Sequence, residues 1–63
     1  MLIKFDGATF DSDSATYEPR GPILVNPDHI DAAYDHTILI QGHKIRVMDD
    51  LEHILAKLEV THG

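Results

Sequence analysis

Residues 36–48, HTILIQGHKIRVM, constrain the fold more than any other stretch of the chain. Apolar and polar residues alternate on both sides of a glycine, which is the pattern of two strands joined by a tight turn. A turn at Gly42-His43 pairs Ile40 with Ile45, whereas a turn at Gln41-Gly42 shifts the pairing by two residues. Both alternatives leave the same apolar residues on one face: Ile38, Ile40, Ile45 and Val47. The stretch therefore predicts a β-hairpin with one apolar face.

A helical pattern follows in residues 49–60, DDLEHILAKLEV. Its apolar residues recur at the spacing of one helix face: Leu51, Ile54, Leu55 and Leu58. We expect Asp49 to be the N-cap and Glu52 to complete a capping box. The pattern predicts a C-terminal helix that packs on a sheet, with residues 60–63 as a frayed tail.

The start of the chain predicts one strand and one loop. MLIKF alternates Leu2 and Lys4 with Ile3 and Phe5, as a strand does, and Asp6-Gly7 is expected to form a turn. Residues 11–22, DSDSATYEPRGP, are rich in turn-forming residues. They are predicted to form a flexible polar loop, which is long for so short a chain.

A polar corner separates the next two strands. ILV at residues 23–25 predicts a short strand, and Asn26-Pro27 predicts a turn that Asp28 supports. The next strand follows from the shared parity of three residues: Ile30, Ala32 and Tyr34. Because proline lacks an N–H donor, the corner is expected at a strand end or a sheet edge.

These elements predict a single α+β domain spanning residues 1–63. Its expected architecture is a small antiparallel sheet of three to five strands with one C-terminal helix on one face. A chain of this length buries only about 60% of its unfolded surface, so its core is marginal. It has no cysteines and hence no disulfides, so oligomerisation is the remaining way to stabilise it.

The charge balance favours some partners over others. Five basic residues face eleven acidic ones, a net charge of -6, without any basic run. Direct nucleic-acid binding is therefore disfavoured, and a protein with a basic surface is the favoured charged partner. The chain lacks an apolar run long enough to span a membrane and begins without a signal-peptide pattern, so we expect a cytoplasmic protein.

The polar residues do not form a motif for catalysis or for metal binding. His29 and Asp31, with Asp28, Asp35 or His36 nearby, are of the right types for zinc or manganese. Their spacing matches no metal motif, and turn formation explains them. The serines lie in the predicted loop, and the glycines are isolated. We therefore expect neither an enzyme nor a cofactor.

The predicted loop and corner are the candidate partner-binding surface. Phe10 and Tyr17 border the loop, and they either attach it to the sheet or present it to a partner. The candidate contact residues are Phe10, Tyr17, Glu18, Arg20, Asn26, Asp28 and His29. Candidate anion contacts, for a nucleotide held between subunits, are Arg20, Lys44 and Arg46.

Residues 23–58 resemble a known family. They contain, in order, a strand ending in Val-Asn, a short corner, Ile, Thr-Ile-x-Ile, a glycine turn, a strand ending in Val and a helix that begins with acidic residues. This pattern is similar to that of the short FlbD-like flagellar and swarming-motility proteins. The resemblance implies a cytoplasmic bacterial protein that acts through protein contacts without a cofactor. Residues 11–21 are an insertion relative to that pattern, and the acidic helix is a second departure from it.

The function expected from these features is a small, non-enzymatic, homo-oligomeric interaction or regulatory module. An alternative is an acidic inhibitor that covers the basic nucleic-acid-binding surface of another protein. Short acidic chains of this kind are also typical of phage-encoded accessory proteins. A third alternative is an oligomer that sequesters a small nucleotide between its subunits.

Overall fold

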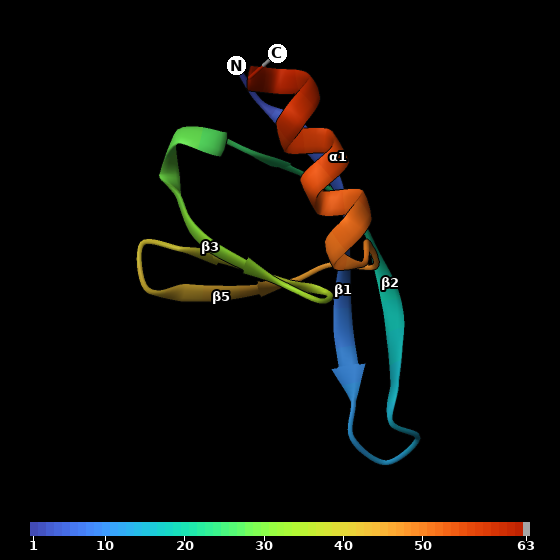
Figure 1. Ribbon diagram of the computed structural model, residues 1–63. Coiled ribbons are helices and arrows are strands. Elements are labelled where there is room, and N and C mark those ends of the chain that lie inside the picture. Colours follow the sequence, from blue (N-terminus) through green and yellow to red (C-terminus); the bar gives the residue numbers. More distant parts are fainter. Residues whose placement is uncertain (63) are drawn as a thin grey trace.

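The structure is a computed structural model that describes residues 1–62, with the side chains of residues 1–59. Within that range, five strands and one α-helix follow one another along the chain (Figure 1). They are β1 (Ile3–Asp11), β2 (Thr16–Val25), β3 (Ile30–Tyr34), β4 (Thr37–Ile40), β5 (His43–Arg46) and α1 (Leu51–His62), with a 3-10 turn at Pro27–His29 after β2.

The strands form two antiparallel sheets rather than one. β1 pairs with β2, and the second sheet has the order β3-β4-β5. The two sheets meet where Gly7 of β1 bridges to Val47, next to a 2.7 Å hydrogen bond from the Met48 N–H to the Asp6 carbonyl. The predicted α+β class with a C-terminal helix is confirmed, and the single sheet is replaced by a hairpin joined to a three-stranded sheet.

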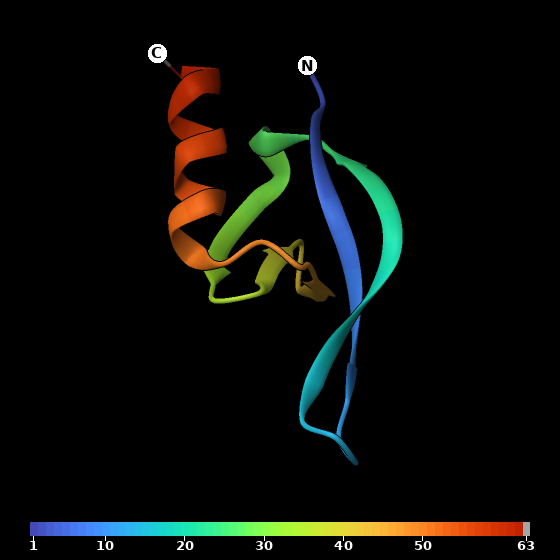
Figure 2. The same cartoon turned by 90° about the vertical axis from the view of Figure 1, so that its right-hand side faces the viewer.

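The β1–β2 hairpin occupies most of the predicted loop. Residues 16–22 belong to β2, and only residues 12–15 form the turn, so the prediction of a flexible loop at 11–22 was wrong. Cross-strand pairs such as Phe10 with Tyr17 and Thr9 with Glu18 stabilise strand pairing despite the prolines. The molecule measures 39 × 21 × 18 Å, and the hairpin tip projects at the end opposite the start of β1 and the end of α1 (Figure 2).

Gly7 lies within β1, so the predicted turn at Asp6-Gly7 was also wrong. Gly7 faces Gly21, and the strand register shifts between Gly7 and Ala8. A Cβ atom on Gly7 would lie 2.9 Å from the Gly21 carbonyl oxygen. The glycine therefore permits close approach of two strands at a bulge rather than a reversal of the chain.

β2 is an edge strand, and Pro22 protects its free edge. The Asp6 N–H donates to Asp49 and the Asp6 carbonyl accepts from Met48, so both groups point away from β2. Asp6 faces Pro22, which makes this a pair without mutual hydrogen bonds. The nitrogen of Pro22 consequently points to the free edge, where proline offers no donor to another strand.

The three-stranded sheet contains the predicted hairpin. Its turn is Gln41-Gly42, with φ angles of 48° and 84°, the positive values of a type I′ turn. Ile38 pairs with Ile45, so the second of the two registers is the observed one and the predicted apolar face is confirmed.

β3 departs from the predicted alternation. Its register with β4 shifts at a bulge between Ile30 and Ala32. Ile30, Ala32 and Tyr34 therefore do not share one face, although the alternation predicted that they would. Ala33 packs against the core instead, and Tyr34 is 54% exposed.

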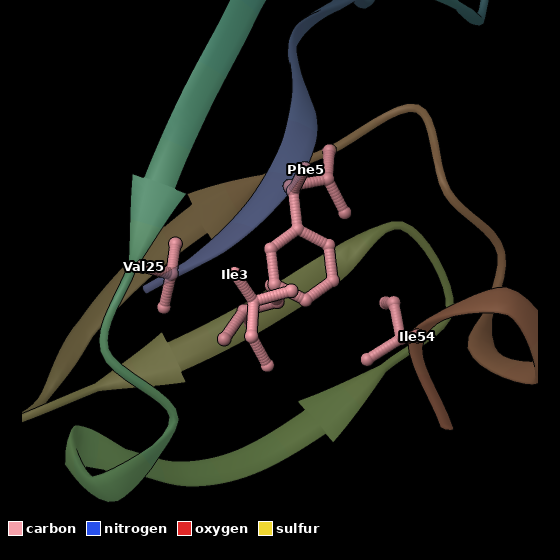
Figure 3. Packing of buried hydrophobic residues seen from close by; sticks show 6 residues of the cluster. Ile3, Phe5, Val25 and Ile54 are labelled. Carbon is pink, nitrogen blue, oxygen red and sulfur yellow. The ribbon is translucent and has the colours of Figure 1, made fainter. Parts of the chain in front are cut away.

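The core is small and lies where both sheets meet the helix. Among the residues whose side chains are described, it consists of six buried hydrophobic residues, Ile3, Phe5, Val25, Ile38, Val47 and Ile54 (Figure 3). Ile54 of α1 is fully buried and Leu58 is partly buried, whereas Leu51 and Leu55 remain 37% and 46% exposed. The predicted helix stripe is therefore only half covered.

The helix begins one residue later than predicted. Asp50, rather than Asp49, is the N-cap, because its Oδ1 accepts the His53 N–H at 2.9 Å. α1 continues to His62, so residues 60–62 of the predicted tail are helical, and Gly63 lies outside the described residues.

Candidate interaction surfaces

An aromatic cluster in the tip half of the β1–β2 hairpin contacts the three-stranded sheet. The Phe10 and Tyr17 rings lie 5.0 Å apart, and Tyr17 stacks on His36 at 4.5 Å. The Arg46 guanidinium lies 5.9 Å from the centre of the Phe10 ring. Of the two predicted roles, Tyr17 attaches the hairpin to the sheet, while Phe10, at 43% exposed, also presents a face to solvent.

His36 is a member of this cluster that the sequence did not indicate. It occupies the turn between β3 and β4 with a φ angle of 57°. Its Nδ1 atom is buried without a hydrogen-bond partner among the described residues. Only contact between distant strands reveals this role, since local sequence places His36 in a polar turn.

A shallow pocket of about 290 Å³ lies on the face of the three-stranded sheet opposite the core. Its lining residues are Tyr34, Thr37, Leu39, Lys44 and Arg46. Thr37 is buried, and its Oγ1 accepts a 3.5 Å hydrogen bond from Arg46 Nη1. Of the three predicted anion contacts, the structure therefore brings Lys44 and Arg46 together and leaves Arg20 outside, on β2.

A larger groove of about 470 Å³ lies between the start of β1 and α1. It is lined by Met1, Leu2, Ile3, Lys4, His53, Ala56 and Lys57. Met1 and Leu2 are 84% and 57% exposed. Leu24 faces Lys4 across the hairpin, on the face opposite the core, and is 65% exposed. Together these residues give one end of the molecule an apolar surface.

One wall of this groove is fixed by Lys57. Its Nζ donates to the Lys4 carbonyl at 3.1 Å and to Asp49 Oδ2 at 2.6 Å. The same ammonium lies 4.8 Å from the centre of the Phe5 ring. These contacts hold α1 against β1 and thereby position the helix side of the groove.

Two carboxylates at the helix start have lowered pKa values for different reasons. Burial opposes ionisation of Asp49, but the Lys57 hydrogen bond, the Asp6 N–H and the Lys57 charge outweigh it and lower its pKa. For Asp50, the hydrogen bond from the His53 N–H is the largest cause of the lowered pKa, and the His53 side chain adds to it. Both carboxylates therefore favour the charged form in the fold.

The predicted partner-binding residues do not form one surface. Phe10, Tyr17 and the exposed Glu18 lie at the tip half of the hairpin, and the exposed Arg20 lies beside the bulge. The corner lies at the other end of β2, about 30 Å from Tyr17 along an extended strand.

The corner uses its polar groups locally. Asn26 Oδ1 accepts the Asp28 N–H at 3.0 Å, and the Asn26 carbonyl accepts the His29 N–H at 3.0 Å. The predicted turn-forming role of this corner is confirmed. Asp28 and His29 are exposed.

The apolar surface at the start of the chain was not among the predicted sites. Leu2 shares strand parity with Lys4, and Leu24 lies between two inward-facing residues, so alternation alone places both leucines away from the core. That signal was present in the sequence, but the position of the helix beside Leu2 was not.

Among the residues whose side chains are described, His, Asp and Glu nowhere gather in threes as a metal ion requires. The helix within residues 1–62 is too short and too polar to cross a membrane. No family model, curated protein or solved structure matches the chain.

Proposed function

We propose that the protein is a non-enzymatic interaction module that associates with a second copy of itself through the surface around the N-terminal groove. The observation that carries this proposal is the exposure of Met1 and Leu2, which line the groove, and of Leu24 on the paired strand β2. Exposed apolar side chains near one another are typical of protein interfaces rather than of isolated monomers.

A second copy is the proposed occupant because the core of one chain is so small. Within residues 1–59, only six hydrophobic side chains are buried in it. When two identical chains associate through the same apolar surface, each copy buries the apolar residues of the other. Both copies therefore gain buried apolar area. A stable interface of about 800 Å² per partner would cover roughly a fifth of the 4336 Å² surface.

The setting we propose for this module is the cytoplasm of a bacterium. The resemblance of residues 23–58 to FlbD-like motility proteins supports it, since such proteins act through protein contacts. The polar corner and the absence of a catalytic motif in the sequence agree with a role in binding rather than in catalysis.

The test is the oligomeric state of the purified chain and of one double variant. Sedimentation velocity over a wide concentration range is expected to show reversible association of the wild type. Leu2→Ser with Leu24→Ser removes apolar surface without touching the core, so this variant is expected to remain monomeric.

Leu55→Ser is the matched control, because Leu55 is a similarly exposed leucine on α1 that does not line the groove. It should associate as the wild type does. A wild type that stays monomeric at high micromolar concentration would remove the proposal, and equal loss of association in the control would move the interface elsewhere.

A further inference from the structure

The outer face of the three-stranded sheet carries a charge opposite to that of the whole chain. The net charge is -6, yet Lys44 and Arg46, two of the five basic residues, line one shallow pocket. Among the described residues, that lining includes no carboxylate. The remaining lining residues, Tyr34, Thr37 and Leu39, are apolar or neutral. The local potential therefore favours an anionic ligand despite the acidic chain.

Both cations are available for a ligand. Lys44 and Arg46 are exposed, and neither forms an ion pair with a carboxylate in the part of the chain whose side chains are described. Arg46 is already held in place by the Thr37 hydroxyl and by the Phe10 ring. A guanidinium fixed in this way loses little side-chain freedom when it binds an anion.

The spacing of the two cations matches an extended peptide. Lys44 and Arg46 are two residues apart on one strand, so their side chains lie on the same face. Their Cα atoms are about 7 Å apart, as for any two alternate residues of a strand. Alternate residues of an extended ligand strand have the same spacing. Two carboxylates on alternate residues can therefore each meet one cation, while the segment between them lies on Leu39 and Tyr34.

A compact phosphate fits this arrangement less well. Both cations would have to converge on one group, but Arg46 is directed towards Thr37 and Phe10. The acidic tip of a second copy also fits less well. Its Asp11 side chain accepts the Asp13 N–H at 3.0 Å, which holds Asp11-Ser12-Asp13 in a turn rather than an extended strand.

We propose that this outer face binds an extended acidic segment of a partner protein, with carboxylates on alternate residues paired with Lys44 and Arg46. The surface is separate from the N-terminal groove, so the inference does not depend on self-association. Because the whole chain is acidic, binding relies on these close contacts rather than on long-range attraction.

The experiment uses a fluorescein-labelled ten-residue peptide that alternates aspartate and threonine, with fluorescence polarisation as the readout. The wild type is expected to bind it saturably. Lys44→Gln with Arg46→Gln is expected to weaken binding about tenfold, because it removes both charged contacts. Lys4→Gln with Arg20→Gln is the matched control, since it removes one lysine and one arginine outside the pocket and is expected to leave binding unchanged.

Circular dichroism melting establishes that each variant is folded. If the double variant does not fold, Lys44→Gln alone replaces it, with a smaller expected loss. The inference is overturned if the wild type does not bind the peptide, or if both double variants lose affinity equally. It is also overturned if ATP displaces the peptide more effectively than unlabelled peptide does, or if the pocket variant changes the oligomeric state instead of peptide binding.

Discussion

At the scale of single residues, Asp49 connects parts of the chain that are distant in sequence. Its carboxylate accepts the Asp6 N–H of β1 at 3.2 Å and the Lys57 ammonium of α1 at 2.6 Å. Its side chain is only 7% exposed. One carboxylate therefore joins the hairpin, the start of the helix and the middle of the helix.

This arrangement predicts loss of stability in acid. The folded state lowers the pKa of Asp49. The stability that its ionised carboxylate adds to the fold is therefore complete above the ordinary pKa of 3.8 and is lost as the pH falls below that value. Asp49→Asn is expected to lower the free energy of unfolding at neutral pH by about 1–3 kcal/mol. The same substitution should also make the free energy of unfolding change less with pH between about pH 5 and pH 2. Urea denaturation at several pH values measures both effects.

Lys57→Met tests whether the lysine is the responsible partner. The effects of Lys57→Met and Asp49→Asn should not add in the double variant, because each breaks the same contact. Part of the acid dependence should persist in Asp49→Asn, since Asp50 has its own lowered pKa. Fully additive effects would contradict the proposed coupling.

The choice between Asp49 and Asp50 shows what sequence reasoning can and cannot give at this scale. Two adjacent acids before an apolar stripe indicate a helix start, and that prediction was correct to within one residue. Which acid is the cap depends on Lys57 and on Asp6, which lies 43 residues away. No local pattern contains that information.

At the scale of elements, the edge of β2 is the feature with the clearest physical consequence. Pro22 replaces an outward-pointing N–H on a free edge, and a long edge strand without such protection is prone to pair with other chains. The proline that argued for a loop in the sequence thus protects a strand.

Pro22→Val is therefore expected to increase edge-to-edge association. Static light scattering at high protein concentration should rise relative to the wild type, and thioflavin fluorescence should rise on prolonged incubation. Pro27→Ala is the control, because Pro27 lies in the 3-10 turn rather than in a strand. Unchanged scattering for Pro22→Val would mean that another feature protects this edge.

The elements differ in how far the sequence determined them. The hairpin at β4–β5 and the helix follow from strict periodicity and were predicted correctly. The strand predicted at residues 23–25 is the end of β2, but residues 16–22 were missed. Pro19, Gly21 and Pro22 outweigh Thr16 and Tyr17 in any local count, whereas pairing with β1 decides the outcome. The bulge in β3 has no local signal beyond an exposed aspartate.

At the scale of the whole molecule, net charge opposes compactness. Eleven acidic side chains share a small surface with five basic ones, so like charges repel throughout the fold. We expect sodium chloride, raised from about 10 mM to about 0.3 M, to increase the urea midpoint of unfolding as screening shortens the range of repulsion.

Removing two exposed acids should reduce this dependence. Asp13→Asn with Glu18→Gln leaves the Asp49–Lys57 ion pair and the Asp50–His53 contact intact and lowers the net negative charge. Its urea midpoint should change less with salt than that of the wild type. A wild-type midpoint that falls with added salt would mean that attraction, chiefly between Asp49 and Lys57, outweighs the repulsion.

The candidate surfaces were predicted least well at this scale. The sequence identified Phe10, Tyr17, Lys44 and Arg46 as separate candidates, and the fold places them around adjoining parts of one sheet and one hairpin. The groove beside Met1 requires the docking angle of α1, which depends on how Ile54 and Lys57 pack against β1. Such angles follow from tertiary packing rather than from periodicity.

The placement of the chain ends has a practical consequence for experiments on this protein. The start of β1 and the end of α1 lie at the end of the molecule opposite the hairpin turn, and Met1 itself lines the groove (Figure 1). An affinity tag or fluorescent protein fused ahead of Met1 would therefore shield the groove and make an associating protein behave as a monomer. A small label inserted within residues 12–15 would leave the groove uncovered and keep assays of self-association informative.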